Sequence, residues 1–452
     1  MELSSQTNIP VSAQSPSEPP CFYLTSQEPP THARGYSYSL AYIQLCYSLL
    51  QQGLSPRSVT CVLSCLANYA PLDFKSIAAY TSINGWRLKI EQGDLEAPKR
   101  KRLKGSYALI TDISMSVGKR RLLVMVAIDL GSWKFDRALR ISDIEVVGLH
   151  VQPTFKGKDI HRCLLQLGRE HPDMTVDYVV SDQGPELING IARCGMKRVA
   201  DVHHFFAKEL RNHYTKTPEY EAFISEVSSF KFKNNMNDFA CLRPPRLGHH
   251  SRFMSIGNVA KWAKKLLDWQ IEGHTPVSLH RFHEASRWLE KHRFIINQLL
   301  HVTATGHQLL KVLKTQGLSW KSLDQCGQIL NEAGLPPDVE QRYCRYFDEQ
   351  LKNFYADEGR LSLVDGTLIC SSDVVESLFG IYKSRTAKHL DSRYLSLINY
   401  GASNLKKETL KYYLERITTV EAHERIQELL VDQIKENRKA IQKDIRRQKT
   451  TD

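Results

Sequence analysis

The order of apolar segments between residues 107 and 202 restricts the fold most strongly. Short β-branched and apolar runs alternate there with stretches of helical periodicity. The expected elements are strands at 107–113, 122–130 and 139–151, a helix at 158–169, a strand at 176–180, a helix at 185–194 and a strand at 198–202. The first two runs are separated by a polar turn and predict a hairpin of core strands. This order predicts a mixed sheet flanked by helices.

Three hairpin-type strands followed by helix, strand, helix and strand is the order of the ribonuclease-H-like fold. From Phe206 to about Leu363 the pattern is helical and poor in strands, which predicts an all-α insertion into that core. Ser371-Ser372-Asp373 then leads into a short helix that runs to Tyr382. The predicted fold class is therefore an α/β ribonuclease-H-like catalytic core interrupted by an all-α insertion, preceded by a helical domain.

Two helices are expected before the core, at 38–50 and from Pro56 to Leu66, with Gly53 as the C-cap of the first. Helix, tight turn and helix is the outline of a helix-turn-helix DNA-binding domain, but a plain helical packing domain has the same outline. Residues 73–92 predict a further helix of this unit.

The last part of the chain, from Lys407 onward, is helical and highly charged in pattern. Its apolar residues, among them Leu410, Leu414 and Ile417, offer a seam that could pair with a partner chain. The expected organisation is a disordered tail (1–33), a helix-turn-helix domain (34–97), a basic linker (98–105), the first part of the core (106–214), a helical insertion (215–365), the last part of the core (366–406) and a charged C-terminal helix (407–452).

The charge balance favours a polyanionic partner. Lys and Arg number 61 against 49 Asp and Glu, which gives a formal net charge of +12. Part of the excess lies in the linker, at Lys99, Arg100, Lys101, Arg102 and Lys104. This run is either a solvated linker or a contact to nucleic-acid phosphates, and in a host with a nucleus it could also be an import signal.

Composition excludes several classes of protein. Apolar residues make up 42% and charged residues 24%, values of an ordinary globular chain. The longest apolar run, Leu122 to Ile128, is far shorter than the ~20 residues of a membrane span. The N-terminus lacks the charged and apolar regions of a secretory signal, and the 10 cysteines resemble neither a disulfide framework nor a zinc cluster. A cytoplasmic protein is expected.

Two carboxylates follow predicted core strands. Asp112 follows the apolar run 108–110, and Asp182 directly follows Val180. In a ribonuclease-H-like sheet these strands are neighbours, so both side chains are expected at one sheet edge as hard oxygen ligands for divalent metal. The alternative for either residue alone is a turn or N-cap role, and Asp182 in Ser-Asp-Gln-Gly-Pro fits a turn before a helix.

The third candidate carboxylate is Glu376, one turn into the helix that begins after Ser371-Ser372. A side chain at this position would face back toward the sheet. The alternative is local, because Asp373 as N-cap and Glu376 three residues later form a capping box.

Three strings resemble the acidic motifs of DDE transposases of bacterial insertion sequences. They are Leu-Ile-Thr-Asp112-Ile, Val-Val-Ser-Asp182-Gln-Gly-Pro-Glu-Leu and Ser-Asp-Val-Val-Glu376-Ser-Leu-Phe-Gly-Ile-Tyr-Lys383. Asp201-Val-His-His204 also looks like the Asp/Cys-x-x-His signature of the groups that carry a helical insertion. The resemblance covers roughly residues 106–215 and 366–390, and the N-terminal helices match more loosely.

The resemblance implies metal-dependent cleavage at transposon ends and transfer of the 3′-hydroxyl into target DNA. Asp112, Asp182 and Glu376 would hold two Mg²⁺ or Mn²⁺ ions. Lys383 would meet a phosphate of the transposon end, with Arg385 extending the same basic face. His204, with Asp201, would position the scissile phosphate or brace the strand, or else be a histidine satisfied inside the fold. The implied partners are double-stranded DNA and a second copy of the chain, in a homodimer or higher oligomer.

Some positions depart from the family pattern. The Tyr and Arg that one large insertion-sequence family places before its Glu are Ile369 and Ser372 here, so no subgroup is assigned. Two alternatives stay open. The first is another ribonuclease-H-like nuclease, although exonucleases of that fold carry a second acid where this chain has Ser114. The second is a non-catalytic DNA-binding protein derived from a transposase.

Overall fold

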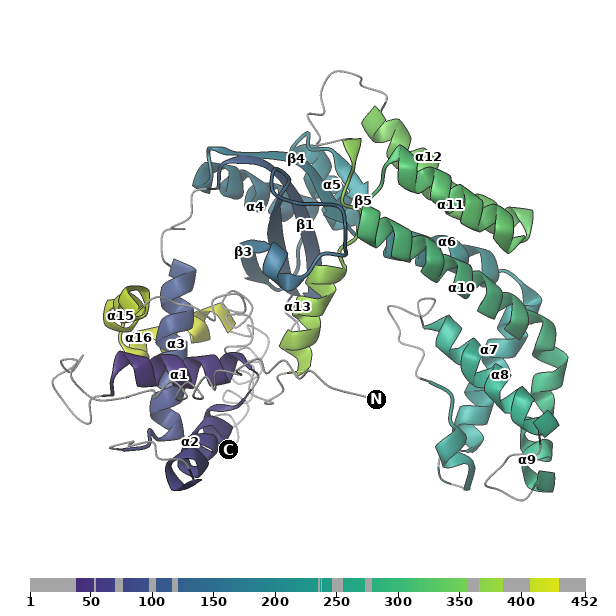
Figure 1. Cartoon of the computed structure of the whole chain (residues 1–452), viewed down its shortest axis with the longest axis horizontal. Helices are drawn as coiled ribbons and strands as arrows, with labels where there is room; N and C mark the ends of the chain where they lie inside the picture. Colours follow the sequence, from purple (N-terminus) through teal and green to yellow (C-terminus); the bar gives the residue numbers. More distant parts are fainter. Residues whose placement is uncertain are drawn as a thin grey trace, which may run out of the picture. The chain divides into compact units, whose positions relative to one another are not determined.

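The computed structural model describes residues 38–52, 54–69, 76–96, 103–115, 121–234, 236, 238–245, 255–272, 279–355, 366–384 and 407–430. These residues form two compact units (Figure 1). The sheet unit comprises the described residues from 103 to 384. The helical unit comprises the described residues from 38 to 96 and from 407 to 430.

The sheet unit is built on five strands in the spatial order β3-β2-β1-β4-β5. They are β1 (Gly105–Met115), β2 (Arg121–Asp129), β3 (Glu145–Gln152), β4 (Met174–Ser181) and β5 (Arg198–Ala200). The first three strands are antiparallel neighbours, whereas β4 runs parallel to β1 and β5 runs parallel to β4. This is the mixed α/β sheet that the sequence predicts, and its order is compatible with a ribonuclease-H-like core.

Both faces of the central strands are buried. Two helices pack on one face: α4 (Gly157–Glu170) and α5 (Pro185–Arg193). Leu109 and Val179 belong to the core beneath these helices. Ile110 and Val180, which point to the opposite face, are equally inaccessible to solvent. Burial on both faces explains why the strands read as continuous apolar runs and not as alternating ones.

The two helices approach each other closely at a glycine. A Cβ atom added to Gly190 of α5 would lie 2.4 Å from the Cβ of Ile160 in α4. No side chain fits at that distance without displacement of one helix. Gly190 therefore sets the spacing between α4 and α5 and, through them, the packing on the sheet.

The third strand begins later than the sequence predicts. Residues 141–143 form a 3₁₀ turn, and β3 starts only at Glu145. The carboxylate of Asp143 accepts a hydrogen bond from the Arg140 amide at 2.7 Å and two from the Arg137 guanidinium at 2.6 and 2.8 Å. These bonds favour a tight turn over an extended strand in this segment.

The described chain from residue 202 to residue 355 is helical, as predicted. Its helices are α6 (Val202–Tyr214), α7 (Pro218–Lys233), α8 (Ile256–Glu272), α9 (Leu279–Ser286), α10 (Arg293–Gln316), α11 (Trp320–Ala333) and α12 (Pro337–Tyr355). Aromatic rings from three parts of this segment form a common core, since the rings of Phe230, Trp262 and Trp288 lie within 6.5 Å of one another.

The chain returns to the sheet through a short extended segment. Leu368 exchanges two backbone hydrogen bonds with Leu318, at 2.8 and 2.9 Å. The amide of Ile369 donates to the hydroxyl of Tyr178 on β4 at 2.8 Å. Helix α13 (Asp373–Ser384) begins just after this segment, so its first turn is held at the sheet.

The helical unit contains five described helices: α1 (Leu40–Gln51), α2 (Pro56–Tyr69), α3 (Tyr80–Glu96), α15 (Lys407–Arg416) and α16 (Thr419–Leu430). The predicted start of the third helix near residue 73 is wrong, because residues 76–79 are not helical. The amide of Ala78 donates to the Tyr42 hydroxyl at 2.9 Å, and its carbonyl accepts from Thr60 at 3.2 Å. These side chains hold the segment outside the helix.

The C-terminal part is not one helix. Thr418 and Glu421 cap each other's amides at 2.7 and 3.1 Å, so a new helix begins at Thr419. Leu410 and Leu414, which the sequence offers to a partner chain, are buried within the helical unit. Helix α15 packs on α3, where Gly93 leaves room for the ring of Tyr413.

Two further observations concern the whole described chain. None of its helices is both long and apolar enough to cross a membrane. All nine cysteines in the described ranges are free thiols.

We expect Gly190→Ala to destabilise the protein, because the new methyl group would overlap Ile160. Overpacking of this kind costs about 1–3 kcal/mol. The matched control is Gly168→Ala on α4, where a Cβ atom has open space and the change should be neutral or stabilising. Urea unfolding of both variants measures the difference. Equal free energies of unfolding would contradict the proposed role of Gly190.

Candidate active site

Asp112 and Asp182 lie on neighbouring parallel strands at the same sheet edge. The register of β1 and β4 pairs Ile110 with Val180 and Thr111 with Ser181. Each Asp is the next residue after the last of these pairs. The two strands are neighbours, with Asp182 directly after the end of β4 and Asp112 inside the last part of β1, three residues before its end.

Each of these carboxylates uses one oxygen on a nearby backbone amide. Oδ1 of Asp112 accepts from the Ile113 amide at 2.6 Å. Oδ1 of Asp182 accepts from the Gly184 amide at 2.8 Å, which forms a turn directly before α5. The turn role expected as an alternative for Asp182 is therefore present. The second oxygen of each carboxylate has no hydrogen-bond partner among the described residues.

Asp112 is in an environment that disfavours its charge. Burial and the neighbouring carboxylate of Asp182 raise the pKa of Asp112 to about 6, although the Ile113 amide and His204 act in the opposite direction. Two carboxylates that crowd each other in a buried place gain from a cation or a proton between them. The site therefore attracts positive charge.

Arg198 braces the end of β4 from the neighbouring strand. Its Nε donates to the Ser181 hydroxyl and its Nη2 donates to the carbonyl of Asp182, both at 2.8 Å. Burial lowers the pKa of this guanidinium. The hydrogen bonds fix the backbone that carries Asp182, and nothing in the spacing of the sequence singles out this arginine.

Asp201 connects the start of α6 with the start of α13. It is the N-cap of α6 and is fully buried. Its Oδ1 accepts from the amide of His204 at 2.7 Å and lies 2.9 Å from the Nδ1 of the same residue. Its Oδ2 accepts from the amide and the hydroxyl of Ser372, at 2.6 and 2.9 Å. Burial alone would raise the pKa of Asp201, but these donors outweigh it and the net shift is downward.

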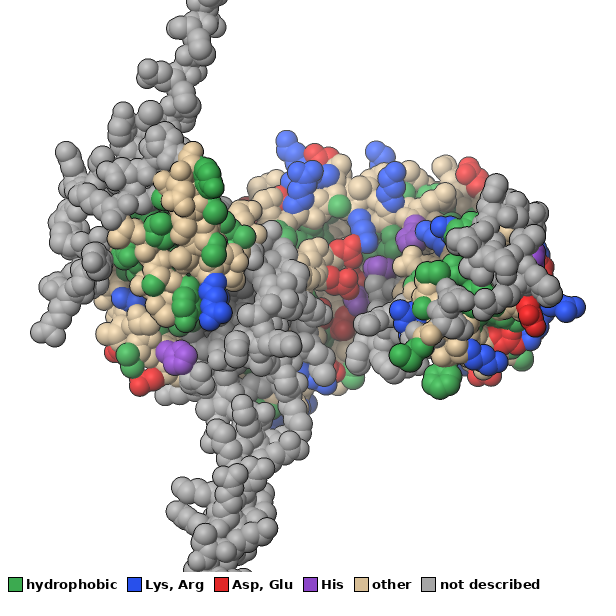
Figure 2. Space-filling view, turned by 90° about the horizontal axis from the view of Figure 1, so that it is seen from below, with side chains coloured by type: hydrophobic (Ala, Val, Ile, Leu, Met, Phe, Trp, Pro, Cys, Tyr) green, Lys and Arg blue, Asp and Glu red, His purple; other side chains and the backbone are tan. Residues whose placement is uncertain are grey.

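His204 connects Asp201 to Glu376. Its Nε2 lies 3.4 Å from Oε1 of Glu376. Burial opposes the charged imidazolium, yet the bond to Asp201 and the carboxylates of Glu376 and Asp112 raise the pKa of His204 to about 9. His204 is thus a cation at neutral pH, with Nδ1 bonded to Asp201 and Nε2 in an ion pair with Glu376. Figure 2 shows acidic and His side chains side by side near the middle of the view.

The capping box expected as an alternative for Glu376 does not form. Helix α13 already begins at Asp373, whose carboxylate pairs with Lys314 and lies 3.7 Å from Nδ1 of His203. Burial would raise the pKa of Asp373, but these two partners hold it well below its usual range. Glu376 is therefore free of a local capping role. Burial also raises the pKa of Glu376, against the effect of His204.

The sequence analysis predicts further basic residues that contact DNA, and most of their side chains lie outside the described residues. Lys383 lies within α13, but its side chain is outside the described residues. Arg385 and the linker residues 99–102 are likewise outside them. Lys104 is exposed just before β1. Lys314 and His203, which hold Asp373, were not predicted as site residues.

The donor set suits a hard divalent cation, which prefers carboxylate oxygens. The raised pKa values of Asp112 and Glu376 are what crowded, partly buried carboxylates show. Across the described ranges, however, no three Asp, Glu, His or Cys side chains are already grouped closely enough to hold a metal ion. Glu376 is engaged by His204, so joint ligation requires its side chain to turn toward Asp112.

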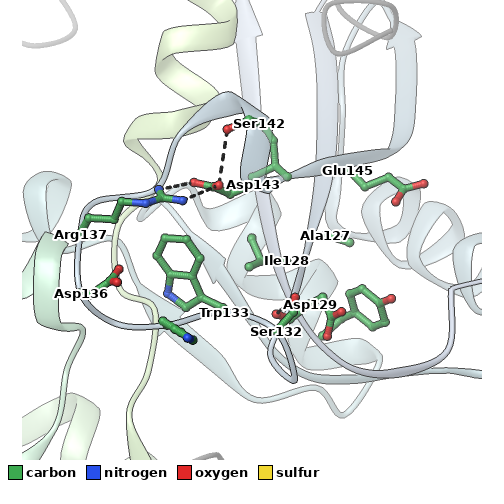
Figure 3. Close-up of a pocket in the computed structure, with 13 residues that line it drawn as sticks. Ala127, Ile128, Asp129, Ser132, Trp133, Asp136, Arg137, Ser142, Asp143 and Glu145 are labelled. Atoms are coloured by element: carbon green, nitrogen blue, oxygen red, sulfur yellow. Dashed lines mark hydrogen bonds and ion pairs between the residues drawn. The ribbon is translucent and has the colours of Figure 1, made fainter. Parts of the chain in front are cut away.

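A separate polar hollow of about 480 Å³ lies at the other end of β2 (Figure 3). Arg137 lies over the ring of Trp133 at 5.0 Å and pairs with Asp143. Asp129 in its wall is paired with Tyr107 on β1, whereas Asp112 is paired with Val124. Five residues at ~3.3 Å each separate the two places along the strand. The hollow is therefore distinct from the candidate active site.

Comparison with known proteins gives no family for this chain. No protein-family model matches it, and no curated protein matches it.

We expect Asp201→Asn to lower the free energy of unfolding by about 2 kcal/mol, because hydrogen bonds to a charged acceptor contribute about 1.5–3 kcal/mol. The substitution should also lower the pKa of His204 from its value of about 9. Urea unfolding measures the first effect, and NMR titration of the His204 ring in metal-free protein measures the second.

The difference in the free energy of unfolding between wild type and Asp201→Asn should depend on pH. The folded-state pKa of His204 lies above its ordinary value of 6.5, so its stabilising effect is fully present below pH 6.5 and is lost as the pH rises through about 9. Exposed Asp324→Asn is the control and should change neither quantity. A stability difference that does not vary between pH 6 and 10 would contradict the charged pair.

Proposed function

We propose that this chain is a DDE-type DNA transposase that hydrolyses a phosphodiester bond at an element's end and transfers the 3′-hydroxyl into target DNA. The observation that carries the proposal is the placement of Asp112 and Asp182 directly after the last paired residues of adjacent parallel strands, with Glu376 paired to His204 in the first turn of α13. The motif strings around these three residues support the same conclusion.

In this proposal Asp112, Asp182 and Glu376 would hold two Mg²⁺ or Mn²⁺ ions, and the bound ions would supply activation of the attacking water or 3′-hydroxyl and stabilisation of the leaving oxygen. The role of the protein is to hold the carboxylates in fixed positions. Rigid strands carry the two Asp residues, and Arg198 fixes the backbone of Asp182. Ligands on rigid, hydrogen-bonded elements keep the reacting groups in line.

His204 positions Glu376. As a cation held by Asp201, it pairs with Glu376 through Nε2 and holds that carboxylate in place. If Glu376 served as a metal ligand, the Nε2–H of His204 would be free to face the site. An imidazolium there can donate to a phosphate oxygen of the DNA.

The rest of the proposal concerns the other parts of the chain. Residues 215–365 are a helical insertion in the ribonuclease-H-like core. Helices α1 to α3 belong to a helix-turn-helix DNA-binding domain; in support, Ser55 caps the amide of Ser58 at the start of α2, after a short turn. The basic linker and Lys383 contact DNA phosphates. A homodimer or higher oligomer in the cytoplasm, at the nucleoid, holds two element ends.

The test is metal-dependent cleavage of a DNA duplex that carries the element's end, with Glu376→Gln as the variant. This substitution keeps the shape of the side chain and removes its charge. We expect at least a hundredfold loss of cleavage with DNA binding intact, because a ligand to the metals is lost while the protein surface is unchanged. Exposed Glu332→Gln on α11 is the control and should cleave like wild type.

Two results would contradict the proposal. Equal cleavage by wild type and Glu376→Gln would remove Glu376 from the metal site. A wild-type protein that binds the element's end but does not cut it with either metal would favour the non-catalytic DNA-binding alternative.

A further inference from the structure

Helix α10 has an unusual charge pattern. Its 24 residues include no Asp or Glu but carry Arg293, Lys311 and Lys314 together with two histidines. A solvent-facing helix normally mixes charges of both signs. A helix of this length without acids creates a one-sided positive field.

The two lysines toward the end of α10 share one face of the helix with Thr303 and His307. Thr303, His307, Lys311 and Lys314 follow one another at spacings of four, four and three residues, which places them in one row along the helix. Helix α8 packs beside this row. A Cβ atom added to Gly257 of α8 would lie only 3.0 Å from the Thr303 hydroxyl.

Helix α8 adds three more cations at the same place. Lys261, Lys264 and Lys265 line a hollow of about 350 Å³ together with Leu300 of α10. Lys264 pairs with Asp268 of its own helix, and Lys265 lies 4.7 Å over the ring of Trp269. Within the described ranges Lys261 and Lys311 have no hydrogen-bond or ion-pair partner, although both are exposed. The set Lys261, Lys264, Lys265, His307, Lys311 and Lys314 is called the α8–α10 basic surface below.

The electrostatics around His307 show that these groups converge. Burial lowers the pKa of His307, and Lys261, His203 and Lys314 lower it further. The two lysines come from α8 and α10, and His203 comes from α6. The carboxylates at the two ends of the surface, Asp268 and Asp373, are each engaged by a lysine of the set.

The α8–α10 basic surface ends at the candidate active site. Lys314 pairs with Asp373, and Glu376 lies with Asp373 in the first turn of α13. His203 reaches the same Asp373 at 3.7 Å, and its neighbour His204 reaches Glu376 at 3.4 Å. Positive groups therefore continue from α8 to within one helical turn of Glu376.

We propose that the α8–α10 basic surface binds the sugar-phosphate backbone of duplex DNA next to the bond that is cut. The proposal rests on the proposed function for the identity of the polyanion. Lys261 and Lys265 are one turn apart, about 6 Å along the helix axis. A DNA strand carries a phosphate every ~3.4 Å along the duplex axis, so such a row meets successive or alternate phosphates. The row directs the duplex toward the three carboxylates.

The test is the salt dependence of binding to a short DNA duplex of arbitrary sequence. The variant is Lys261→Gln, Lys265→Gln and Lys311→Gln combined, and none of these residues belongs to the catalytic machinery. Each phosphate contact contributes about 0.9 to the slope of log K against log salt concentration. We expect the slope of the variant to be smaller by about 2 to 3, with a loss of affinity at low salt of at least tenfold.

A matched control removes the same charge elsewhere. Lys216→Gln, Lys231→Gln and Lys321→Gln combined change exposed lysines outside α8 and α10 and should leave the slope within error of wild type. Equal losses in the two triple variants would overturn the proposal, because they would reflect net charge alone. An unchanged slope in the first variant would overturn it as well.

The same measurements separate this proposal from the proposed function. A reduced slope in a protein that shows no metal-dependent cleavage supports the surface and rejects the transposase. Cleavage of the element's end by the triple variant at wild-type rate and affinity retains the transposase and rejects the surface.

Discussion

The candidate site depends on one buried carboxylate. Asp201 is shielded from solvent and receives four hydrogen bonds, two from His204 and two from Ser372. An ionised group in that position costs a large desolvation free energy unless its oxygens are satisfied. The chain meets this requirement only when the start of α6 and the start of α13, 171 residues apart, are in place together. This arrangement fixes the positions of His204 and Glu376, so the buried Asp201 holds two residues of the candidate site in place.

The long helical excursion between α6 and α13 is compatible with a fixed site because its end is tied back to the sheet. The backbone pair of Leu318 and Leu368 and the bond from Ile369 to Tyr178 hold the returning segment. Loop closure over such a length costs only a little more entropy than over a short loop. The excursion also brings Lys314 to Asp373, so the positive groups of α10 and the carboxylates of the sheet edge form one continuous electrostatic environment.

Sequence reasoning predicted the parts that follow from local pattern. Apolar runs gave the strands within a few residues, and Asp112 and Asp182 could be placed together because parallel neighbours end at the same edge. The differences arise where side chains from distant segments intervene. Tyr42 and Thr60 hold Ala78 outside α3, and the Thr418 cap divides the C-terminal helix. The bond from Asp201 to Ser372 and the contact of Lys314 with Asp373 are long-range, and no spacing in the sequence indicates them. The absence of Asp and Glu from the 24 residues of α10 is visible in the sequence. That lysines of α8 lie beside this helix is visible only in the structure.

The central claim is that Asp112, Asp182 and Glu376 form a site for divalent metal. Titration of Mn²⁺ followed by electron paramagnetic resonance counts bound ions directly and needs no DNA. The account predicts that wild type binds Mn²⁺ and that Asp182→Asn weakens binding by at least tenfold, whereas Asp136→Asn in the other polar hollow leaves it unchanged. Equal Mn²⁺ binding by wild type and Asp182→Asn would contradict the account.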